Sequence, residues 1–181
     1  VLIGVLAGLC SWTLAEVIKI LSSLNQLEAA SSLDFRMIHG LVFGFFLYFK
    51  KNLLFSRLYI TPLRILIGLA GSLICVSLSL TLIYLFSIET MVTHGLSLFW
   101  ILLGLFLGCW NALASQSFPI LIKQGALGSL GGIVGSILIQ FSDTLPLEGL
   151  ETSLGLMLYG FVLFSILHLA EKLSFKAYLI V

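Results

Sequence analysis

Long, nearly unbroken runs of apolar residues recur along the whole chain, and short stretches with charged and turn-forming residues separate them. Each run is roughly 20 residues long, the length that a helix needs to cross a bilayer. Continuous rather than alternating apolar runs favour helices over barrel strands, and a helix satisfies its own backbone polar groups in hydrocarbon. We therefore predict an all-α polytopic membrane protein with six transmembrane helices. The predicted spans are Leu2–Leu21, Phe35–Phe55, Leu63–Phe86, Leu96–Ser115, Ile120–Phe141 and Leu154–Leu173.

Composition supports this prediction. The 181 residues are 60% hydrophobic and only 9% charged, whereas soluble domains carry about 25% charged residues. A net charge of +1 provides no basic excess for binding nucleic acid. A soluble globular domain and a nucleic-acid-binding protein are both excluded.

The charges also predict an orientation. With six spans, the loops after the second and fourth helices and the tail after the sixth lie on one side of the membrane. The basic residues at that side are Lys50, Lys51, Arg57, Arg64, Lys123, Lys172 and Lys176. The other side holds the acids Glu28, Asp34, Glu89, Asp143, Glu148 and Glu151, with Lys19 and Arg36. The positive-inside rule then predicts that both termini are cytoplasmic, in a bacterial inner membrane.

Both ends of the sequence point to a longer protein. The chain starts at Val1 without an initiator Met or a basic flank, so we expect a truncated N-terminus. The apolar segment Phe175–Val181 follows the last predicted helix. We expect it to lead into a soluble C-terminal domain.

Short sequence matches predict an internal repeat. The segment Gly68–Leu73 resembles Gly125–Leu130 at an offset of 57 residues, and His39 and His94 both precede Gly-Leu, 55 residues apart. We predict one transmembrane domain over 1–181, built from three helical hairpins at 1–60, 61–118 and 119–181. Their common orientation would give a pseudo-threefold bundle. The alternative is chance similarity among Leu-, Ile- and Gly-rich helices.

Glycines at a spacing of four residues occur in most of the predicted helices. Small residues at this spacing let helix backbones approach closely in lipid, where no hydrophobic force holds helices together. The helix at 120–141 is the expected packing centre, and we expect Gly132 to tolerate a larger side chain less well than Gly155. A pore-lining or oligomer-forming glycine zipper is the alternative. The predicted packing glycines are Gly4, Gly8, Gly40, Gly44, Gly68, Gly71, Gly104, Gly108, Gly125, Gly128, Gly131, Gly132 and Gly135.

Polar residues inside a membrane are costly, so each is a functional candidate. All but one of these candidates lie near predicted helix ends, where long side chains can reach the interface. Glu16 is the exception; it could act in a proton or cation path, or pair with Lys19 or Arg36. His39 and His94 are expected to be interfacial or capping residues. The candidates are Glu16, Asn111, Lys123, His168 and Glu171.

The sequence provides little evidence for catalysis. Six spans with Ser129 and His168 resemble the rhomboid proteases only superficially, because their Gly-x-Ser-Gly motif is absent. Cys10, Cys75 and Cys109 form no CxxC motif, and no residue spacing predicts a metal site. We predict no enzymatic activity, no cofactor and no metal.

Three features follow one another along the chain: Trp12-xxx-Glu16, a glycine-rich helix ending near Gln140–Asp143, and the closing segment Glu171–Val181. In this order they resemble a poorly characterised bacterial family. Its members are glycine-rich multi-span membrane proteins with repeated helical hairpins. The resemblance implies a cytoplasmic domain after the last helix, in some members forkhead-associated-like, and implies no catalytic residues. The chain departs from the family pattern in having fewer glycines in its third and sixth helices.

These features predict a structural or anchoring subunit of a larger complex. Its expected partners are the lipid bilayer and other membrane or cytoplasmic subunits. The alternative is a small-solute transporter or the membrane subunit of one, which needs few charges around an apolar cavity. The substitution Glu16→Gln distinguishes the two, because only a transporter is expected to lose uptake.

Overall fold

The protein is all-helical in the part of the chain that the structure describes, as predicted. The computed structural model describes residues 2–24, 35–54, 62–86, 98–113, 117–146 and 150–178. These residues contain six helices and no strand. The helices are α1 (Leu2–Leu24), α3 (Phe35–Leu54), α4 (Pro62–Phe86), α5 (Leu98–Ala112), α6 (Phe118–Asp143) and α7 (Glu151–Tyr178).

Four of these helices are long and apolar enough to cross a membrane, which indicates a membrane protein. They cover Leu2–Leu21, Ile65–Leu85, Phe118–Asp143 and Glu151–Leu173. Helix α5 has 15 residues and a length of only about 22 Å, short of the ~30 Å hydrocarbon core. Helix α3 includes Arg36, Lys50 and Lys51 within its bounds. Four of the six predicted spans therefore have the length and the apolar character that a membrane span needs, and the spans at α3 and α5 stay predictions.

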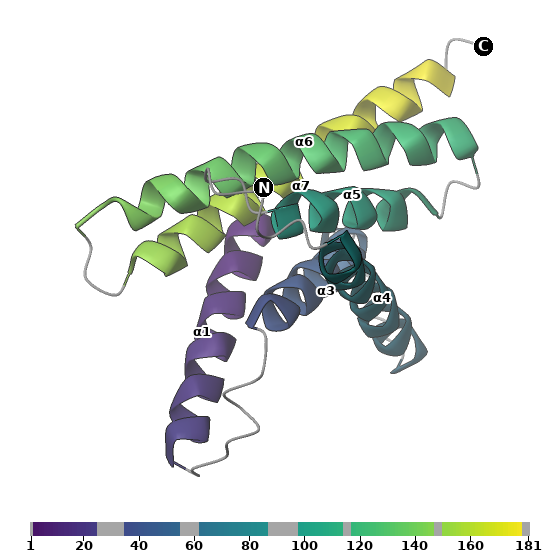
Figure 1. Ribbon diagram of the computed structural model, residues 1–181. Helices are drawn as coiled ribbons and strands as arrows, with labels where there is room; N and C mark the ends of the chain where they lie inside the picture. Colours follow the sequence, from purple (N-terminus) through teal and green to yellow (C-terminus); the bar gives the residue numbers. More distant parts are fainter. Residues whose placement is uncertain are drawn as a thin grey trace.

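The helices pack in chain order, and the chain closes on itself because α1 also contacts α7. Helices α5, α6 and α7 lie side by side, while α1, α3 and α4 run obliquely to them (Figure 1). Contacts occur within the predicted hairpins but also between them, as in the pair of α5 and α6. The three-hairpin repeat therefore stays a prediction.

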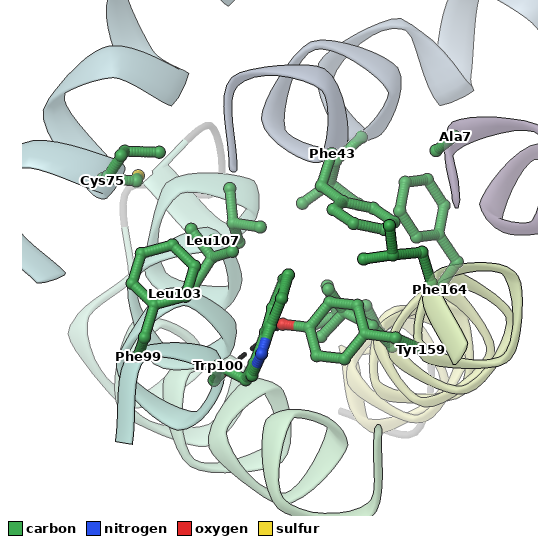
Figure 2. Close-up of a cluster of buried hydrophobic side chains, with 14 of the residues drawn as sticks. Ala7, Phe43, Cys75, Phe99, Trp100, Leu103, Leu107, Tyr159 and Phe164 are labelled. Atoms are coloured by element: carbon green, nitrogen blue, oxygen red, sulfur yellow. Dashed lines mark hydrogen bonds between the residues drawn. The ribbon is translucent and has the colours of Figure 1, made fainter. Parts of the chain in front are cut away.

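Aromatic side chains from α3, α5 and α7 meet in the buried core (Figure 2). The ring centroid of Trp100 lies 4.6 Å from that of Tyr159 and 5.1 Å from that of Phe99. The hydroxyl of Tyr159 donates a hydrogen bond of 3.1 Å to the backbone carbonyl of Trp100, which satisfies a polar group that is fully buried. This core joins the α5–α6–α7 layer to α3.

The predicted packing glycines face neighbouring helices. A Cβ atom added at any of the thirteen would lie 3.1 Å or less from an atom of another helix. At Gly104 it would lie 2.3 Å from the carbonyl oxygen of Gly128 in α6, and at Gly4 it would lie 2.2 Å from that of Gly160 in α7. These backbones touch directly, so no side chain fits between them.

Helix α6 uses two glycine faces. Gly132 abuts Trp100 of α5, where an added Cβ would lie 2.4 Å from the carbonyl oxygen, and Gly135 abuts the ring of Tyr159 in α7 at the same distance. Gly155, expected to tolerate a larger side chain better than Gly132, also abuts α6, and a Cβ there would lie 2.4 Å from the Ser142 hydroxyl and 3.1 Å from Ile139 Cα. Its position near a helix end does not leave it free, because the first turns of α7 already pack on α6.

Candidate functional site

Four helices bring Lys50, Asn111, Gln124 and Glu171 together in what we call the polar cluster. The Lys50 ammonium nitrogen lies 2.9 Å from Oε2 of Glu171. The side-chain nitrogen of Asn111 donates to Oε1 of Glu171 at 2.8 Å and to Oε1 of Gln124 at 2.9 Å. Lys50, Gln124 and Glu171 are buried, with at most 9% of each residue exposed. Both carboxylate oxygens therefore have partners from other helices.

Chain direction explains why these residues meet. Lys50, Asn111 and Glu171 belong to the C-terminal parts of α3, α5 and α7, and Gln124 to the N-terminal part of α6. Helix α6 runs antiparallel to α5 and α7 (Figure 1), so its first turns lie beside their last turns. The cluster thus lies at one end of the layer.

The electrostatics of the cluster depend on mutual compensation. A buried charge costs several kcal/mol unless an opposite charge and hydrogen bonds offset the lost hydration. The Glu171 carboxylate has the Lys50 ammonium on one oxygen and the Asn111 amide on the other. Removing either charged partner takes the ion pair of 2.9 Å from the other, which stays buried. Through these contacts, the cluster can hold α3, α5, α6 and α7 in fixed positions relative to one another.

His168 lies at the rim of the polar cluster. Its Nδ1 is 3.8 Å from Oε2 of Glu171, one helical turn away on α7, and 41% of its side chain is exposed. His168 is therefore more exposed than Glu171, whose side chain is 11% exposed. Among the residues described, no group of three or more His, Cys, Asp or Glu side chains is arranged to hold a metal ion.

A second polar contact joins α1 to α3. The hydroxyl of Ser11 and Nδ1 of His39 are 2.5 Å apart and buried. The His39 ring stacks on Trp100 with 6.1 Å between centroids. We expected His39 to be an interfacial or capping residue; within the protein it is buried, because α1 and α5 cover that face of α3. Its predicted repeat counterpart, His94, lies outside the described residues.

The five polar candidates separate in space. Asn111 and Glu171 belong to the polar cluster and His168 to its rim, whereas Lys123 is exposed beside Gln124. Glu16 is not in the core; it pairs with Lys19 at 2.6 Å on the surface of α1. The Lys19 ammonium also lies 5.2 Å from the centroid of the Phe35 ring.

Sequence reasoning missed three residues of these contacts. The charge pattern groups Lys50 with the loop that follows it, it singles out Lys123 rather than its uncharged neighbour Gln124, and it does not mark Ser11. A signal existed for Lys50, because it follows an apolar run on the same predicted side of the membrane as Glu171. No comparable signal existed for Gln124 or Ser11.

No protein family, curated protein or solved structure matches the chain. The resemblance to a glycine-rich bacterial membrane family therefore stays a prediction.

Proposed function

We propose that the chain is an integral membrane scaffold, a structural or anchoring subunit of a larger complex. The observation that carries this proposal is the polar cluster, in which the buried charges of Lys50 and Glu171 compensate each other. The Asn111 amide donates hydrogen bonds to the second carboxylate oxygen of Glu171 and to the amide oxygen of Gln124. Groups that engage one another in this way suit a fixed bundle better than a substrate site.

The glycine contacts support the same proposal. In lipid, helices associate through close packing and interhelical hydrogen bonds. Direct backbone contacts at Gly104 and Gly132 join α5 to α6, and one at Gly4 joins α1 to α7. We infer a rigid, glycine-packed bundle of six transmembrane helices.

We further propose that both termini face the cytoplasm of a bacterial inner membrane. Lys123 and Lys172 are exposed, and each is the sequence neighbour of a residue of the polar cluster. They therefore lie at the same end of the layer as the cluster, while Asp143 and Glu151 lie at the opposite end. This asymmetry agrees with the positive-inside rule. The proposed partners are other membrane or cytoplasmic subunits rather than nucleic acid.

A small-solute transporter is the second candidate. The observation that favours it is the same ion pair, because charged residues within membrane-spanning helices mark proton and substrate pathways in many transporters. The half-exposed His168, close to the Glu171 carboxylate, would connect that pathway to the surroundings.

One experiment separates the two candidates. The full-length protein is purified from its source membrane in a mild detergent, as wild type, as Glu171→Gln and as the exposed control Lys123→Gln, and co-purifying molecules are identified by mass spectrometry. A scaffold keeps protein partners in fixed ratio in the wild type and in Lys123→Gln, and loses them in Glu171→Gln. A chain that elutes alone with a bound small solute, and whose Glu171→Gln variant fails to take up that solute, overturns the proposal.

A further inference from the structure

We draw no further inference here: the strongest candidate, the apolar groove between α1 and α3 that Leu14, Val17 and Phe46 help to line, is an open surface, and nothing in the structure shows what covers it.

Discussion

Lys50 and Glu171 form a buried ion pair of 2.9 Å between the ends of α3 and α7. The two helices are far apart in the sequence, and Asn111 of α5 attaches to the same carboxylate. This relationship makes the Lys50–Glu171 pair the first place to test how the bundle is held together.

Removing one member of the pair is expected to cost more than removing both. Lys50→Met or Glu171→Met takes the ion pair from a charge that stays buried and is expected to lower the free energy of unfolding by about 3–5 kcal/mol. The double variant removes both charges and is expected to recover most of that loss. Unfolding of the purified protein in mixed detergent micelles measures the three variants. Lys123→Met, at an exposed position, is the control, and additive single and double effects would contradict a direct pair.

The amide of Asn111 is expected to matter as a donor. Asn111→Leu preserves the approximate size of the side chain but leaves the oxygens of Gln124 and Glu171 without their shared donor. Unsatisfied buried acceptors of this kind cost about 1–3 kcal/mol each. The same unfolding assay measures the loss. A variant as stable as the wild type would show that other groups satisfy these oxygens.

Substitution at Gly132 is expected to separate α5 from α6. The first atom of any side chain would lie 2.4 Å from the carbonyl oxygen of Trp100, so even Gly132→Ala is expected to destabilise the protein by about 1–3 kcal/mol. Gly132→Leu is expected to prevent assembly. Ala126→Leu, on the exposed face of the same helix, is the matched control. Size-exclusion profiles and detergent stability compare the variants, and equal behaviour of Gly132→Leu and Ala126→Leu would refute the packing role.

The hydrogen bond between Ser11 and His39 is expected to contribute modestly. Interhelical hydrogen bonds in membrane proteins average about 0.6 kcal/mol and reach about 1.7, so Ser11→Ala is expected to cost an amount in this range. Ser129→Ala is the control, because the Ser129 hydroxyl donates to the Ala126 carbonyl of its own helix at 2.8 Å. A larger loss in Ser129→Ala than in Ser11→Ala would contradict the interhelical role.

Glu16→Gln is expected to leave stability and partner binding nearly unchanged. Glu16 pairs with Lys19 at a position where 38% and 51% of the two side chains are exposed, and exposed pairs contribute about 0–1 kcal/mol. Stability in detergent and recovery of co-purifying subunits measure the outcome. Loss of solute uptake in this variant would favour the transporter and count against the scaffold.

Helix positions were predictable because the signal for them is local. The predicted span Leu63–Phe86 and the observed Pro62–Phe86 differ by one residue at the start, and Leu2–Leu21 falls within α1. In hydrocarbon each helix must satisfy its own backbone groups, so a run of apolar residues determines a helix without reference to its neighbours. The predicted span and the apolar part of α7 both end at Leu173, while the helix itself continues to Tyr178, because hydropathy does not detect a helix that continues past the apolar run.

The sequence by itself determined the class of protein, the positions of the helices and the glycines able to lie at close contacts. Only the tertiary structure decided which helices meet. Gly4 faces Gly160 and Lys50 faces Glu171 because α1 and α3 pack obliquely on the α5–α6–α7 layer. Glycine spacing shows that a helix can approach another closely but does not specify which one, and the partner of a polar side chain depends on that choice. The polar cluster and the apolar groove are both products of this packing, and neither is encoded in any one segment of the chain.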